Sequence, residues 1–167
     1  MSWINKLRTI FKKSSFQIRN EDVTALKSGF LILHDFYERN HGDIAMAQKC
    51  TYYVLNISEN SKPTEIIFFC HELATMYARD LKYYDNAILF YKMGLDYVKL
   101  TRYDDQKSDL VYFTALLGKS YFFKNDYKNA LDYYLNAKAL IEKTGEGKED
   151  MDTILSSIES IQKKIDN

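Results

Sequence analysis

The strongest constraint on the fold is an internal repeat that covers roughly residues 64–144. The stretches YARDLKYYDNAILFYKMG, from Tyr77, and YFFKNDYKNALDYYLNA, from Tyr121, carry the same residue types at the same spacing. The copies lie 44 residues apart in their first half and 43 in their second, so the second copy is one residue shorter between its helices. The matched positions are Cys70, Leu73, Ala74, Tyr77, Ala87, Tyr91 and Gly94 with Thr114, Leu117, Gly118, Tyr121, Ala130, Tyr134 and Ala137. This pattern predicts repeated helix pairs that share a core, with small residues where two helices approach closely.

The spacing within each copy resembles the tetratricopeptide repeat, whose pattern includes Leu-Gly-x2-Tyr followed by Ala-x3-Phe. The second copy contains Leu117-Gly118-x2-Tyr121 and then Ala130-x3-Tyr134. The match departs from the family in three ways: no Trp precedes the Leu, no Pro closes either copy, and the period is longer than the usual 34 residues. The resemblance implies an all-α, right-handed superhelical array of antiparallel helix pairs (a TPR-like α-solenoid), with the first helix of each pair lining a concave, ligand-binding surface.

The segments on either side of the two copies are expected to complete one helical domain over residues 21–167. A chain of 167 residues suits a single domain with its own core. We expect a degenerate first repeat, two regular repeats and a C-terminal capping helix, at residues 22–59, 64–101, 107–143 and 149–166. A helix at the end of a repeat array is expected to cover the apolar face that the last repeat leaves open.

Residues 1–20 differ in character from the rest of the chain. Apolar residues fall on one helical face, basic residues accompany them, and no acidic residue precedes Glu21. Such a segment can pack on the first repeat as a cap, bind a partner or an anionic membrane surface, act as a targeting segment, or remain a disordered tail. The residues that we expect to make a membrane or partner contact are Trp3, Ile4, Leu7, Lys12 and Lys13.

Two motif fragments suggest chemistry, and neither is complete. Gly118-Lys119-Ser120 has the end of a phosphate-binding loop, but Phe113 stands where that loop needs its first Gly. His71 begins a zinc motif that needs a second His four residues later, and Thr75 occupies that position. We therefore expect no catalytic residue, no metal and no cofactor, and predict a non-catalytic protein.

Overall charge and cysteine content restrict the partners and the compartment. Lys plus Arg and Asp plus Glu number 23 each, so no net field favours nucleic acid. Cys50 and Cys70 form no Cys-x-x-Cys motif and are expected to be buried thiols in a reducing compartment. With no apolar run near 18 residues, these features predict a cytoplasmic protein.

The predicted ligand groove lies on the first helices of the repeats. Helical spacing of three and four, and a shift of 44 residues from the second repeat to the first, select one surface that is aromatic and locally basic. Its residues are Lys27, Leu31, His34, Phe68, His71, Thr75, Arg79, Tyr112, Lys119 and Phe122, with Ala115 between Tyr112 and Lys119 on the same face. We expect the partner to be a protein or peptide that presents an extended or helical segment with acidic and apolar residues.

The groove lacks the residues of one known specificity in the family. The family's clamp for chaperone C-terminal tails uses a Lys-x3-Asn, an Asn and a Lys-x3-Arg. Lys27 matches, whereas Leu31, Glu72, Tyr112 and Leu116 do not. The main prediction is therefore an adaptor, scaffold or chaperone-like module of a different specificity. The alternatives are a membrane-surface adaptor anchored by residues 1–20 and a regulatory subunit of a larger complex.

Overall fold

The computed structural model describes residues 18–101 and 107–166 of the chain. The described residues form seven α-helices and no strand, which confirms the prediction of an all-helical protein. The helices are α2 (Asn20–Phe36), α3 (Ile44–Asn56), α4 (Pro63–Met76), α5 (Tyr84–Leu100), α6 (Lys107–Phe123), α7 (Tyr127–Thr144) and α8 (Met151–Ile165). Two π-helical turns, η1 (Tyr37–His41) and η2 (Tyr77–Leu81), follow α2 and α4, and a short 3-10 turn, η4 (Lys148–Asp150), precedes α8.

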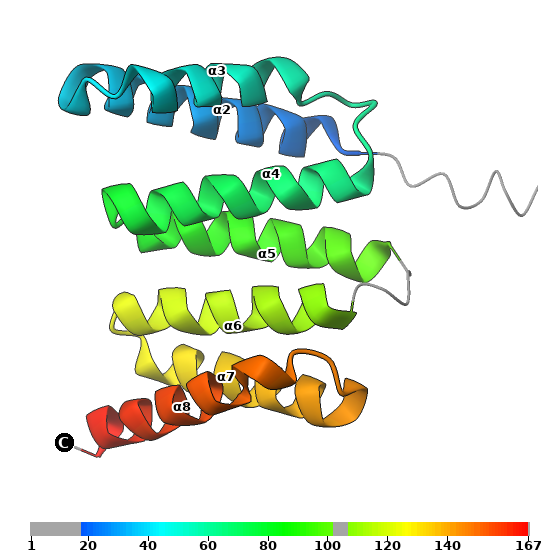
Figure 1. Ribbon diagram of the computed structural model, residues 1–167, viewed down its shortest axis with the longest axis vertical. Coiled ribbons are helices and arrows are strands. Elements are labelled where there is room, and N and C mark those ends of the chain that lie inside the picture. The colour runs from blue at the N-terminus through cyan, green and yellow to red at the C-terminus, as the bar shows by residue number, and fades with distance from the viewer. Residues whose placement is uncertain (1–17, 102–106, 167) are drawn as a thin grey trace, which may run out of the picture.

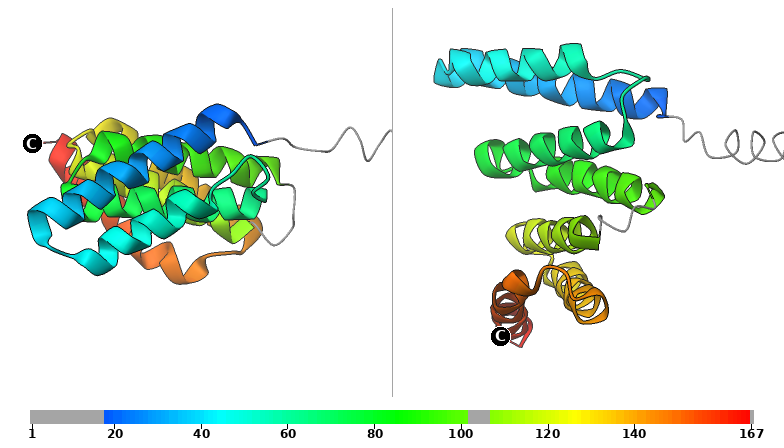
Figure 2. Two further views of the ribbon diagram at one scale, coloured as in Figure 1. Left: turned by 90° about the horizontal axis from the view of Figure 1, so that it is seen from above. Right: turned by 45° about the vertical axis from the view of Figure 1, so that its right-hand side comes forward.

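The helices form three antiparallel pairs that lie one above another, α2 with α3, α4 with α5 and α6 with α7 (Figure 1). Seen along the stack, the first pair runs at an angle to the pairs below it (Figure 2). At the C-terminal end α8 packs against α7 and buries Ile154, Ile158 and Ile161. One apolar core of buried side chains runs through all of these helices.

Local signals in the sequence explain where several helices begin and end. Asp43 and Asp126 cap α3 and α7, since each carboxylate accepts a hydrogen bond from a backbone N–H in the first turn. Pro63 opens α4, where its missing N–H costs nothing. Gly145 ends α7 in the left-handed conformation, with φ of 76°.

The turn inside each helix pair is built in the same way and begins at a tyrosine. The carbonyl of Tyr37 accepts a hydrogen bond from the N–H of Asp43 at 3.0 Å, and the carbonyl of Tyr77 accepts one from the N–H of Tyr83 at 3.1 Å. In the third pair the carbonyl of Tyr121 accepts one from the N–H of Asp126, one residue nearer along the chain. The third turn is therefore one residue tighter, which explains the change in repeat offset from 44 to 43.

These turns correct the register of the first pair. Because Tyr37 and Tyr77 occupy the same place in their turns, the first two pairs are offset by 40 residues, not by the 44 that the sequence analysis applied. Burial agrees with this offset. Leu33 corresponds to Leu73 and Tyr37 to Tyr77, and all four side chains are buried. The counterpart of His71 on α2 is consequently Leu31, and not Lys27, which an offset of 44 residues selects.

Small residues lie where helices approach most closely. A Cβ built at Gly94 of α5 would overlap the ring of Phe113 on α6, and one at Gly118 would lie 3.0 Å from the ring of Tyr134 on α7. Ala130, on the facing side of α7, is fully buried. Two of the chain's small repeat positions thus set how near α6 comes to its neighbours on both sides.

Polar clusters of one kind join the first helix pair to the second. In each, a tyrosine hydroxyl donates to a carboxylate that also binds a cation, and the cluster spans the two pairs. The three clusters are Tyr37 with Asp80 and Arg79, Tyr53 with Glu72 and Lys49, and Tyr97 with Asp22 and Arg19. A carboxylate that accepts several hydrogen bonds can be buried between helices at low cost.

Both cysteines are buried in the core as free thiols, as the sequence analysis predicted. Burial raises the pKa of the Cys50 thiol to about 11 and raises that of Cys70 as well. Since the thiolate is the reactive form, both side chains behave as small apolar groups in the folded protein.

The close contact at Gly118 leads to a prediction about stability. Gly118→Leu should lower the free energy of unfolding by roughly 1–3 kcal/mol, because the new side chain must displace the ring of Tyr134. Lys119→Leu adds a similar apolar side chain at the neighbouring, exposed position and should leave stability nearly unchanged. Urea denaturation followed by circular dichroism measures both. Equal stability of the two variants would contradict the packing at this contact.

The carboxylates in the joint between the first and second helix pairs lead to a prediction about pH. The hydrogen bond from Arg79 lowers the pKa of Asp80. Burial alone would raise the pKa of Glu72, but the hydrogen bonds from Lys49 and Tyr53 outweigh it and the pKa is lowered. Stability from both groups is therefore present above an unfolded-state pKa of about 4 and is lost as the pH falls below it.

Asp80→Asn isolates this effect. At pH 7 the variant should be less stable than the wild type by about 1–2 kcal/mol, and the difference should shrink as the pH is lowered from 5 to 3. The exposed Asp132→Asn is the control and should differ little from the wild type at any pH. A stability difference for Asp80→Asn that stays constant with pH would refute the role of the charged carboxylate.

Candidate functional site

A cavity of about 460 Å³ lies between α4 and α6, with two tyrosines of α5 behind it. It brings together five residues of the predicted groove: His71, Thr75, Arg79, Tyr112 and Lys119. The other lining residues are Ala78, Lys82, Tyr84, Tyr91, Leu116, Ser120 and Phe123. We call this hollow the α4–α6 cavity; its volume is in the range of sites for a small ligand or a few side chains of a peptide.

The inner part of the α4–α6 cavity is a chain of hydrogen-bonded polar groups. His71 Nε2 lies 3.0 Å from the hydroxyl of Tyr112, and Thr75 Oγ1 lies 2.9 Å from the hydroxyl of Tyr91. Burial lowers the pKa of His71, although the nearby carboxylates of Glu72 and Asp109 oppose that effect. A neutral His71 is thus favoured, and the inner part can exchange hydrogen bonds with a ligand without adding charge.

The walls of the α4–α6 cavity are aromatic. Tyr84, at the start of α5, stacks on Phe123, at the end of α6, with 5.7 Å between ring centroids. Phe123 and Tyr112 remain 49% and 44% exposed, so their rings are available to a ligand. Aromatic walls of this kind favour apolar or aromatic groups.

Three cationic side chains surround the cavity, but they are not equivalent. Arg79 donates from Nε and Nη2 to the two carboxylate oxygens of Asp80, at 2.6 and 2.8 Å, and Asp80 is also bound by Tyr37. Its charge is therefore neutralised within the joint between the first two pairs. Lys82 and Lys119 form no ion pair with any residue that the structure describes. The positive charge available to a ligand belongs to these two lysines.

The remaining residues of the predicted groove lie elsewhere. Phe68 is in edge contact with Tyr53 of α3, with ring centroids 5.8 Å apart, and belongs to the joint with the first pair. Phe122 points to the other side of α6, into a separate hollow beside α8 that Tyr134 also lines. Lys27 and Leu31 lie on α2 outside the α4–α6 cavity, half-buried and exposed respectively.

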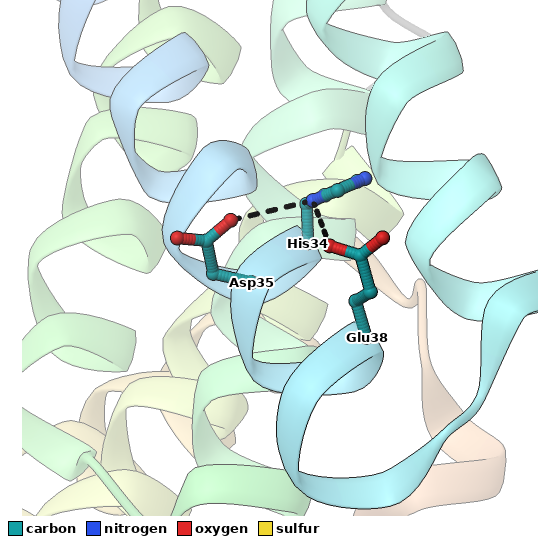
Figure 3. A group of neighbouring side chains, drawn as sticks. All are labelled: His34, Asp35 and Glu38. Atoms are coloured by element: carbon teal, nitrogen blue, oxygen red, sulfur yellow. Dashed lines mark hydrogen bonds and ion pairs between the residues drawn. The ribbon is translucent and has the colours of Figure 1, made fainter.

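His34 belongs to a surface group at the end of α2. Figure 3 shows its Nδ1 between the carboxylates of Asp35, at 3.5 Å, and Glu38, at 4.0 Å. One atom from each residue lies within 4.8 Å of the others, the arrangement nearest to a metal site in the described part of the chain. Asp35 also pairs with Arg39 at 3.5 Å, and both carboxylates are more than half exposed. We interpret the group as ion pairing at the surface.

Several residues that line the α4–α6 cavity were not predicted from the sequence. Helical spacing selected one face of α4 and one of α6, whereas Lys82 and Tyr84 come from the turn after α4 and the start of α5. Lys82 adopts the left-handed conformation, with φ of 58°, which directs the chain sharply from η2 into α5. Only the repeat of the tyrosine turn could have pointed to these positions. The predicted contact residues Trp3, Ile4, Leu7, Lys12 and Lys13 lie outside the described residues.

Comparisons with known proteins do not assign this chain to a family. No protein-family model, no curated protein and no solved structure matches it. Among the described helices, none is long and apolar enough to cross a membrane.

The contrast between Arg79 and Lys119 can be measured as stability. Arg79→Glu should lower the free energy of unfolding by about 1–2 kcal/mol, because Asp80 loses two charge-assisted hydrogen bonds and gains a like charge. Lys119→Glu reverses the same charge at an exposed position and should change stability by less than about 0.5 kcal/mol. Calorimetric melting of the two variants tests the assignment. Equal melting temperatures would mean that the bond to Asp80 contributes nothing.

Proposed function

We propose that this protein is a non-catalytic protein-interaction module, an adaptor, scaffold or chaperone-like protein with a TPR-like fold. In this proposal the helix pairs form a right-handed superhelix whose first helices line a concave groove. Three features support it: the repeated spacing of Leu-x3-Tyr, with Ala74 or Gly118 after the Leu, and of Ala-x3-Tyr; the antiparallel pairs; and the close contact at Gly118. A partner segment would lie across α4 and α6.

The observation that carries the proposal is the composition of the α4–α6 cavity. Two lysines without an ion-pair partner among the described residues lie beside aromatic walls and a neutral, hydrogen-bonding inner part. A partner segment with acidic and apolar residues would place carboxylates near Lys82 and Lys119, and apolar side chains against Tyr84, Phe123 and Tyr112. Such a site combines an electrostatic contact with burial of apolar surface.

The hydroxyl groups of the cavity support the non-catalytic part of the proposal. Ser120 is buried and donates to the carbonyl of Leu116 at 2.8 Å, and Thr75 is bonded to Tyr91. A nucleophile needs an adjacent base that can accept its proton. Ser120 is engaged with the carbonyl of Leu116. Thr75 lies 3.4 Å from Nε2 of His71, but its shorter contact, 2.9 Å, is with Tyr91, and His71 Nε2 is itself 3.0 Å from the hydroxyl of Tyr112. In this proposal these groups serve packing and hydrogen bonding.

Binding tests this function directly. Peptides selected from a displayed library of 12-residue sequences rich in Asp, Glu, Phe, Leu and Trp should bind, and the affinity should fall as salt is raised. Lys82→Gln combined with Lys119→Glu should raise the dissociation constant by at least about tenfold, because one available charge is removed and the other is reversed. Fluorescence anisotropy with a labelled peptide measures the effect.

The matched control is Lys128→Gln combined with Lys164→Glu, which makes the same change in charge at exposed positions outside the cavity. It should leave affinity within about twofold of the wild type. Arg79 is left unchanged in both proteins because its substitution would disturb the joint at Asp80. Failure to select any binder, or equal binding by the two double variants, would refute the cavity as the binding site.

A further inference from the structure

An exposed apolar surface runs along α3, the second helix of the first pair. Ile44, Tyr52 and Leu55 are 53%, 61% and 78% exposed and fall on one side of the helix. We call these three residues the α3 stripe. They face away from α4, which meets α3 at Lys49 and Tyr53.

The corresponding surface of the second pair is an interface between helices. Forty residues later, the counterparts of the α3 stripe are Tyr84, Lys92 and Leu95 on α5. Tyr84 stacks on Phe123 and the ammonium of Lys92 lies 5.4 Å from the ring of Tyr121, both on α6. Leu95 is only 7% exposed. The same side of the second helix is therefore covered in one pair and left open in the other.

The packing of α4 explains why the α3 stripe stays open. In the second pair the following helix, α6, packs on α5, but in the first pair the following helix, α4, packs chiefly on α2. None of the helices that the structure describes lies over the α3 stripe. The surface also carries no free charge, because the one charged residue of α3, Lys49, binds Glu72 at 2.8 Å.

We propose that residues 3–11 of the same chain bind the α3 stripe as an amphipathic helix. Their apolar residues Trp3, Ile4, Leu7, Ile10 and Phe11 have the 3–4 spacing of one helical face. The two apolar surfaces complement each other, since the basic side chains of the segment can stay in water and meet no unpaired cation on α3. Docking of this segment would bury the most exposed large apolar side chain of the described chain, Leu55.

The position of α2 makes this contact reachable. α2 begins and α3 ends at the same end of the first helix pair, on the right in Figure 1. The chain therefore enters α2 beside the end of the stripe near Leu55. At 1.5 Å per residue, a helix made of the nine residues 3–11 is about 13 Å long, and the stripe from Ile44 to Leu55 extends over about 16 Å of α3. A helix of residues 3–11 that runs back along α3 can therefore cover most of the stripe, and residues 12–19 supply the connection to α2.

Trp3 is the only tryptophan of the chain, so its fluorescence reports on this contact in the full-length protein. In dilute solution without lipid its emission should be shifted to shorter wavelength than in the urea-unfolded chain. Its quenching constant with acrylamide should be lower by at least roughly twofold, as expected for an indole buried against apolar side chains. Both properties should be independent of protein concentration.

Variants of the stripe identify the site. Leu55→Asp, and separately Tyr52→Asp, should return Trp3 to the emission and quenching of a solvent-exposed indole while circular dichroism shows the helices intact. The control is Leu135→Asp, on α7 and 45% exposed, which should leave Trp3 protected. Two independent stripe variants guard against loss of folding in one of them.

Four outcomes would overturn the proposal. They are an exposed Trp3 in the wild type, a protected Trp3 that ignores both stripe variants, protection that appears only as concentration drives formation of dimers, and protection that appears only with vesicles of anionic lipid. The third outcome would assign the stripe to a second copy of the chain, and the fourth would assign residues 3–11 to a membrane surface. Sedimentation velocity at low and high protein concentration separates the intramolecular contact from a dimer.

Discussion

The close approach of α5 and α6 at Gly94 is the contact on which the site depends. Because Gly94 has no side chain, the ring of Phe113 can occupy the space over α5. Phe113 in turn lies within 6.2 Å, between ring centroids, of both His71 and Tyr91. Tyr112, the residue before Phe113 on α6, then lies beside His71, and the two form the hydrogen bond in the inner part of the α4–α6 cavity. A larger side chain at position 94 would separate the two helices and open this arrangement.

Both joints of the stack contain close apolar contacts, among them Leu73 against Gly29 at the first joint, but their polar contacts differ. The second and third pairs meet through apolar and aromatic contacts around Gly94 and Phe113, a hydrogen bond between His71 and Tyr112, and an ion pair between Lys124 and Asp85. The first and second pairs are joined by tyrosine hydroxyls that donate to buried or half-buried carboxylates, as at Asp22 and Glu72. Hydrogen bonds of this kind fix the relative position of two helices, because they need a particular geometry. The polar joint therefore specifies how the first pair sits, with α4 against α2 and the α3 stripe left open.

The same polar joint decides the charge of the cavity. Arg79 has the right position to bind an anionic ligand, but its guanidinium is held by Asp80, which Tyr37 holds from the first pair. Lys82 and Lys119 then remain as the cations that a ligand can meet. The interaction site and the stability of the stack are thus built from neighbouring residues with separate tasks. Substitutions of Arg79 affect the stack, and substitutions of the two lysines affect the ligand.

The sequence by itself determined the helical class, the repeat and the shorter third turn. These features depend on local interactions: apolar spacing within a helix, capping side chains such as Asp126, and a turn that starts at Tyr121. Helical spacing also placed Tyr112 and Lys119 on one face of α6, and the repeat offset placed His71 on the equivalent face of α4.

Only the tertiary structure decided the rest, because it depends on contacts between residues far apart in the chain. The first pair has lost the repeat's signature residues, so its register of 40 became visible only in the turns at Tyr37 and Tyr77. The neutralisation of Arg79 involves Tyr37, more than forty residues away. Which face of α3 stays open depends on the choice of α4 between two neighbours, α2 and α3. That choice is made by the sum of many contacts across the joint, and no local pattern in the sequence records it.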